Sequence, residues 1–188
     1  MSDITETKQR RWSFDGMGSL GAILVGIAAL YLSWDQGRLM REEIRASVWP
    51  ALQLHGFVNS SDENLAVGLR IQNAGVGPAL VEQVRVYHRG ELIRDVQHLG
   101  EYFPSTAERS FEKLSGRIIA AGAEVKPFEF RYQAAADQDA VVVLNGLVSD
   151  WSGDVCYCSS LKQCWVRSLS TEPPREVAAC DAQAVSDI

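Results

Sequence analysis

The sequence lacks the residue patterns that usually build a catalytic site. Its only histidines are His55, His88 and His98, and none has an acidic partner at a recognisable spacing. There is no Gly-x-Ser-x-Gly nucleophile elbow, no Walker phosphate loop and no His-Glu-x-x-His zinc motif. We therefore expect neither enzymatic activity nor a cofactor.

Positive charge is also scarce in this chain. It has 18 Lys and Arg against 24 Asp and Glu, a net charge of -6. Nucleic-acid-binding proteins usually concentrate positive charge against the phosphate backbone, so this balance argues against a broad nucleic-acid surface. An anionic ligand would have to find a local patch.

One stretch, residues 16–34 (GMGSLGAILVGIAALYLSW), lacks charged side chains altogether. As a helix it would be about 28 Å long, close to the thickness of the hydrocarbon core of a bilayer. Trp12 and Phe14 precede its apolar part, and Tyr31 and Trp34 close it, as is typical of rings at the lipid interface. Because no small-residue cleavage site follows, we expect an uncleaved transmembrane helix after a short N-terminal tail, residues 1–15.

Small side chains recur along this span at helical spacing. Gly18, Ala22 and Gly26 are four residues apart, and Ser33 belongs to a second, looser stripe. In lipid, helices associate where small residues let their backbones approach closely. The pattern predicts a homo-oligomer assembled through the helix. A plain anchor is the alternative, since glycine and alanine are common in transmembrane helices.

A juxtamembrane stalk is expected at residues 35–49. Its apolar residues include a narrow stripe four residues apart, and the other positions are mostly charged. The helix should end before Pro50, because the residue before proline disfavours the α conformation. Gly37 suggests a hinge near the membrane surface. The stripe consists of Met40, Ile44 and Val48.

Beyond Pro50 the apolar pattern becomes alternating, as in half-buried strands. Many short strands with turns between them favour an antiparallel Ig-like β-sandwich over residues 50–170, with a small β-barrel as the alternative. The tail, residues 171–188, is poor in apolar residues and is expected to be disordered. The expected strands are 51–58, 65–72, 80–88, 92–96, 117–120, 127–132, 140–148 and a hairpin over 156–166, with one short helix at 106–114.

Two short motifs accompany this plan: WPAL at residues 49–52 and QNAGVGPAL at residues 72–80. The second motif predicts a strand-connecting loop whose glycines permit positive φ. The plan resembles small bacterial membrane-anchored proteins, among them membrane effectors of nucleotide-signalled antiphage systems such as Hailong and CBASS. That resemblance implies an oligomeric channel switched by a nucleotide or oligonucleotide signal, with the enzyme that makes the signal as a partner.

The chain has four cysteines: Cys156, Cys158, Cys164 and Cys180. In a strand, Cys156 and Cys158 point to one face, and a loop over residues 159–163 would bring Cys158 opposite Cys164. Zinc, disulfides and buried reduced thiols are all compatible with this spacing. We favour reduced thiols and expect no metal, since Cys180 lies in the tail.

The strand at residues 80–88 carries the candidate ligand-binding residues. Alternation places Gln83, Arg85, Tyr87 and Arg89 on one face, and Arg94 from the hairpin partner joins them. Arginines with an intervening tyrosine can contact phosphates and stack on a base. An ordinary solvated sheet face is the alternative interpretation.

The orientation in the membrane is not decided by charge. Lysine and arginine are equally frequent on the two sides of the span. We favour a cytoplasmic sandwich at the bacterial inner membrane, from the resemblance and from the awkwardness of a tail thiol in an exported domain. The first functional hypothesis is an oligomeric single-pass channel effector of antiviral defence that is controlled by a ligand. The second is a membrane-tethered binding or scaffold domain without a pore.

Overall fold

The computed structural model describes residues 11–61, 64–133, 145–146, 149–170 and 172–181. The chain divides into two compact units that meet between Ala46 and Ser47.

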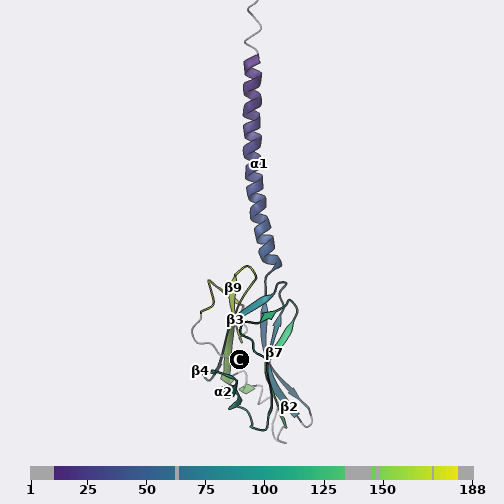
Figure 1. The fold of residues 1–188 in the computed structure, drawn as a ribbon, viewed down its shortest axis with the longest axis vertical. Coiled ribbons are helices and arrows are strands. Elements are labelled where there is room, and N and C mark those ends of the chain that lie inside the picture. The colour runs from purple at the N-terminus through teal and green to yellow at the C-terminus, as the bar shows by residue number, and fades with distance from the viewer. Residues whose placement is uncertain (1–10, 62–63, 134–144, 147–148, 171, 182–188) are drawn as a thin grey trace, which may run out of the picture. The chain divides into compact units, whose positions relative to one another are not determined.

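The first unit is built on α1 (Arg11–Ser47), a continuous helix (Figure 1). Its residues Gly18–Ser47 are long and apolar enough to cross a membrane. A helix of 37 residues is about 55 Å long, well beyond the roughly 30 Å of a hydrocarbon core. The stalk is therefore helical, as expected, and α1 ends before Pro50. Gly37 does not interrupt the helix.

The second unit is a two-sheet antiparallel β-sandwich, seen as two layers in Figure 1. One sheet has the strand order β1-β2-β7-β5, and the other has the order β10-β9-β8-β3-β4, with β6 also paired to β3. No strand pairing joins the sheets within the described ranges, so the sandwich is confirmed over the barrel. The strands are β1 (Leu52–Ser60), β2 (Asn64–Asn73), β3 (Ala79–His88), β4 (Glu91–Leu92), β5 (Glu108–Phe111), β6 (Ile118–Ile119), β7 (Glu124–Gln133), β8 (Trp151–Cys158), β9 (Cys164–Ser168) and β10 (Arg175–Val177).

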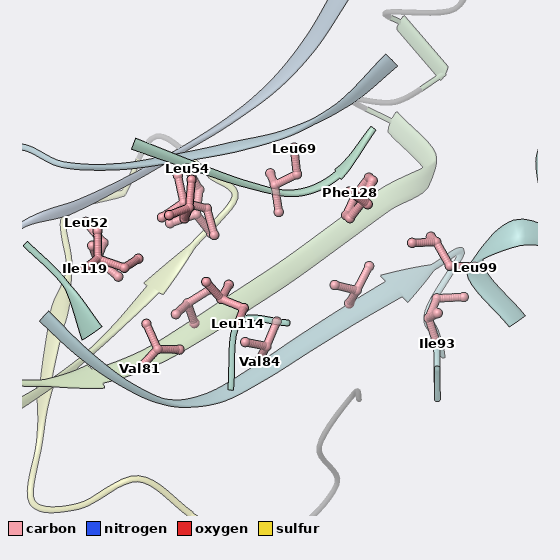
Figure 2. Packing of buried hydrophobic residues seen from close by; sticks show 14 of the residues in the cluster. Leu52, Leu54, Leu69, Val81, Val84, Ile93, Leu99, Leu114, Ile119 and Phe128 are labelled. Atoms are coloured by element: carbon pink, nitrogen blue, oxygen red, sulfur yellow. The ribbon is translucent and has the colours of Figure 1, made fainter. Parts of the chain in front are cut away.

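The hydrophobic core lies between the two sheets. Figure 2 shows Leu54, Leu69 and Phe128 of the four-stranded sheet facing Val81 and Val84 of β3. Along each strand, side chains point alternately inward and outward, and these five point inward. Burying each one stabilises the fold by about 1.5–3 kcal/mol.

The helix expected at residues 106–114 is wrong, because this segment contains β5. Its register along β7 pairs Phe111 with Phe128, and the Phe111 ring lies edge-on to Phe130 at a centroid distance of 5.5 Å. Glu108 also forms an ion pair with Arg131. These partners come from a strand that follows later in the chain, and they override the local helical preference.

The strand expected at residues 92–96 is also largely wrong. β4 ends at Leu92, and a short helix, α2 (Val96–Gly100), follows. Asp95 caps this helix, since its Oδ1 accepts hydrogen bonds from the backbone N–H groups of Gln97 (2.9 Å) and His98 (2.8 Å). An aspartate at this position satisfies donors that have no partner within the helix.

Two further predictions concern residues 140–148 and the tail, residues 171–188. Most of the strand expected at 140–148 lies outside the described residues, and residues 145–146 are helical. The disorder expected for the tail is wrong for residues 172–181, because β10 pairs with β9. Residues 182–188 lie outside the described part.

Asn73 is a buried hydrogen-bonding centre at the end of β2. Its Oδ1 accepts from the backbone N–H of Ala51 (3.1 Å) and of Gly75 (3.0 Å). Its Nδ2 donates to the carbonyls of Gly77 (2.8 Å) and Ile119 (3.0 Å). One fully buried amide thus joins the segment before β1, the loop after β2, and β6.

Close approach explains the glycines of that loop. A Cβ on Gly75 would lie 2.4 Å from the backbone nitrogen of Ala51, and one on Gly77 would lie 2.0 Å from the carbonyl oxygen of Val48. Neither glycine has a positive φ, so close packing and not a left-handed backbone requires glycine here. The QNAGVGPAL motif therefore contains a loop that packs closely against residues 48–51.

Replacing Asn73→Ala should lower the free energy of unfolding by about 3 kcal/mol or more. The change removes four hydrogen bonds and leaves buried backbone groups without their partner. Urea unfolding of the full chain in detergent micelles measures the loss. Gln72→Ala, at the adjacent exposed position, is the control and should change stability by less than about 0.5 kcal/mol. Equal losses in the two variants would contradict this role of Asn73.

Candidate ligand-binding face

The outer face of β3 carries most of the predicted ligand-binding residues. A bulge between Val81 and Gln83 interrupts the register with β8. Beyond it, Val84 points into the core, whereas Arg85 and Tyr87 occupy alternate positions that are only partly buried. The predicted common face is therefore present for Gln83, Arg85 and Tyr87.

Arg85 is paired with a carboxylate from the neighbouring strand. Its Nε donates to Oδ1 of Asp154 on β8 at 2.8 Å, and both side chains are about three-quarters buried. This hydrogen bond raises the pKa of Arg85 above its usual range, although burial acts in the opposite direction. The charges of Asp154, Tyr87 and Asp181 act in the same direction as the hydrogen bond. Arg85 is therefore a fixed positive charge that is partly neutralised.

Arg89 lies in a turn and not on the strand face. Arg89 and Gly90 have φ values of 48° and 84°, which close a tight hairpin between His88 and Glu91. Arg89 Nη2 contacts Oδ2 of Asp150 at 2.8 Å. The hydrogen bond from Arg89 lowers the pKa of Asp150.

Arg94 lies between β4 and α2, and its side chain is exposed. Its backbone N–H donates to His98 Nδ1 at 3.4 Å. The predicted set therefore separates into a strand face (Gln83, Arg85 and Tyr87) and two exposed arginines in connecting segments. We call the strand set the outer face of β3.

The C-terminal segment reaches this face, which the sequence did not suggest. β10 pairs with β9 at one edge of the sheet. Cys180 then forms a disulfide with Cys156 on β8. Finally, Gln83 Nε2 donates a hydrogen bond to the backbone carbonyl of Asp181, and Gln83 is only 3% exposed.

All four cysteines are paired, so the expected reduced thiols are corrected. Cys158 lies directly opposite Cys164 in the β8–β9 register, as predicted, and the two form a disulfide. The second disulfide joins Cys156 and Cys180, and Cys180 Sγ lies 3.9 Å from Cys158 Sγ. Zinc is bound by thiolates, and sulfurs paired in this way offer none.

The interior of the sandwich offers little room for a ligand. A cavity of about 50 Å³ lies between the sheets, and its lining is almost entirely apolar. Ligand pockets usually measure several hundred Å³. Two open, polar hollows of about 350 and 340 Å³ lie on the four-stranded sheet, where Glu129 and Arg131 line both. The outer face of β3 is the candidate site that the sequence predicted.

The small residues of α1 lie on the surface of the single chain. A Cβ placed on Gly18 or Gly26 would meet no atom within 4 Å, and Ala22 and Ser33 are exposed. The surface that a second helix would need is therefore open in the described helix.

No protein-family model matches the chain, and no curated protein is significantly similar to it. The fold and its surfaces define the class: an apolar membrane-type helix followed by a disulfide-bonded β-sandwich.

The two disulfides should contribute unequally to stability. They close loops with sequence separations of 24 and 6, for which chain entropy predicts about 3.5 and about 2.3 kcal/mol. Cys156→Ser/Cys180→Ser should therefore lower the free energy of unfolding by about 1 kcal/mol more than Cys158→Ser/Cys164→Ser. Urea unfolding of the two double variants in detergent micelles tests the order, and the reverse order would contradict it.

Proposed function

We propose that this chain is a membrane-tethered, oligomeric binding protein. In this proposal α1 anchors the chain and associates with α1 of other copies. The outer face of β3 is the binding surface, and it takes a ligand with an acidic group. One observation carries the proposal: the same chain has two exposed features of this kind. The helix has a surface of small residues, and the sandwich holds Arg85 in a fixed position on its outer face.

The disulfides support an exported sandwich in place of the cytoplasmic one that the sequence favoured. Disulfides persist in oxidising compartments and are rare in the cytosol. The argument from a tail thiol also loses its force, because Cys180 is bonded to Cys156. We therefore place the sandwich on the outer side of the membrane in this proposal.

The second candidate is the channel effector of bacterial antiviral defence. The stripe of Gly18, Ala22 and Gly26 supports it, since helices packed this closely can surround a pore. A nucleotide or oligonucleotide signal would require the sandwich to be cytoplasmic. The compartment of the sandwich therefore separates the two candidates.

In this proposal, all four cysteines should be oxidised to disulfides in intact cells. After an acid quench, free thiols are alkylated with N-ethylmaleimide in denaturant near neutral pH, and disulfides are then reduced and labelled with its deuterated form. Mass spectrometry should find the heavy label on Cys156, Cys158, Cys164 and Cys180. Protease access to the sandwich in spheroplasts serves as the control for orientation. Light label on all four, with a protected sandwich, would favour the cytoplasmic channel effector.

Replacing Gly18, Ala22 and Gly26 by isoleucine should abolish self-association, because branched side chains prevent close contact of the helix backbones. Crosslinking in membranes followed by gel electrophoresis measures the oligomer. The matched control is Leu20→Ile/Leu24→Ile/Ile27→Leu, which changes three exposed apolar residues of the same helix. Dye measurements of membrane potential address the second candidate: depolarisation by the wild type alone would support a channel. Unchanged crosslinking in the isoleucine variant would refute assembly through this surface.

A further inference from the structure

Residues 175–181, which we call the strap, cross the outer surface of the six-stranded sheet. The strap is attached at three points: β10 on β9, the disulfide to Cys156 on β8, and the hydrogen bond from Gln83 on β3. Cys156 and Gln83 are register partners on neighbouring strands. From the edge strand β10, the strap thus reaches β8 through the disulfide and β3 through Gln83.

This arrangement buries positions that would otherwise face solvent. Outer faces of antiparallel sandwiches are usually solvated, yet Gln83 is 3% exposed and Cys156 is 1% exposed. The non-covalent attachment is short, since β10 has only three register partners on β9. Ordering a terminal segment costs conformational entropy, so the covalent attachment at Cys180 decides whether the strap stays in place.

The strap places a hydrogen-bond acceptor on the outer face of β3. The backbone carbonyl of Asp181 accepts a hydrogen bond from the buried side chain of Gln83. This carbonyl therefore occupies the hydrogen-bonding position at Gln83 that an acidic ligand would take.

We propose that the strap is an autoinhibitory element, latched by Cys156–Cys180, that a dithiol opens to admit an acidic ligand at Gln83 and Arg85. This inference rests on the proposed binding function of the outer face of β3. It adds that binding at this face is regulated, and that a dithiol reduces the Cys156–Cys180 disulfide, which we call the latch.

The opening step is thiol–disulfide exchange. A thiolate of the dithiol attacks Sγ of Cys180, the least buried of the four cysteines, and forms a mixed disulfide. The electron pair of the broken bond goes to Sγ of Cys156, which takes up a proton. The second thiol of the dithiol then attacks the mixed disulfide and releases Cys180 as a thiol. The dithiol is oxidised to a disulfide, and Cys156–Cys180 is reduced.

Hydrogen exchange tests the latch in the full chain in detergent micelles. In Cys156→Ser/Cys180→Ser, the amides of residues 175–177 should exchange at least tenfold faster than in the wild type. The matched control, Cys158→Ser/Cys164→Ser, retains the latch and should leave these amides within about twofold of the wild type. Equal exchange in the two double variants would overturn the latch.

Binding of a fluorescein-labelled hexaglutamate peptide tests autoinhibition, with hexaglutamine as the uncharged control probe. Affinity for hexaglutamate should rise at least tenfold in Cys156→Ser/Cys180→Ser, and adding Arg85→Glu should remove that gain. Equal, Arg85-dependent binding to the wild type and to Cys156→Ser/Cys180→Ser would overturn autoinhibition and leave the binding function standing. If hexaglutamate binds no better than hexaglutamine to either form, the binding function itself fails, whatever the exchange data show.

Discussion

The β-sandwich depends on the buried amide of Asn73. A short amide side chain with two donors and an acceptor oxygen meets four backbone groups from three segments of the chain. Buried backbone groups without partners destabilise a fold, so this amide satisfies a junction where regular sheet pairing ends. The same junction requires glycine at positions 75 and 77, because the backbone of residues 48–51 passes against them. The hydrogen bonds of Asn73 thus connect β2 of one sheet with β6 of the other.

The fold was predictable where local pattern and tertiary environment agree. Alternating apolar residues located β1, β2, β3 and most of β7, since one face of each strand enters the core. The predicted hairpin over residues 156–166 covers the end of β8 and most of β9, but residues 151–155 of β8 were missed. Prediction failed at β5, where residues 108–111 take their conformation from pairing with β7. The cap at Asp95 was present in the sequence and was missed, because the apolar residues around it also fit a strand.

The sequence predicted the residues of the candidate site that lie on β3, but not their partners from distant parts of the chain. Alternation places Arg85 and Tyr87 together, but Asp154, which neutralises Arg85, is 69 residues further along the chain. The contact between Gln83 and Asp181 spans 98 residues. Composition suggested a tail too polar to pack, and it was misleading because a covalent bond and a strand edge replace the missing apolar contacts. The Cys158–Cys164 pair was predictable from hairpin geometry, whereas Cys180 has no local partner.

The position of the cysteines sets an order of events during synthesis. All four lie between residues 156 and 180, after every strand of the four-stranded sheet has been made. Chains emerge from the N-terminus, and disulfides form over seconds to hours. Pairing among β1, β2, β5 and β7 can therefore begin before any cysteine has been made. The core closes only when β8 and β9 arrive, because Val155, Tyr157 and Trp165 belong to it, and the same two strands bring three of the four cysteines.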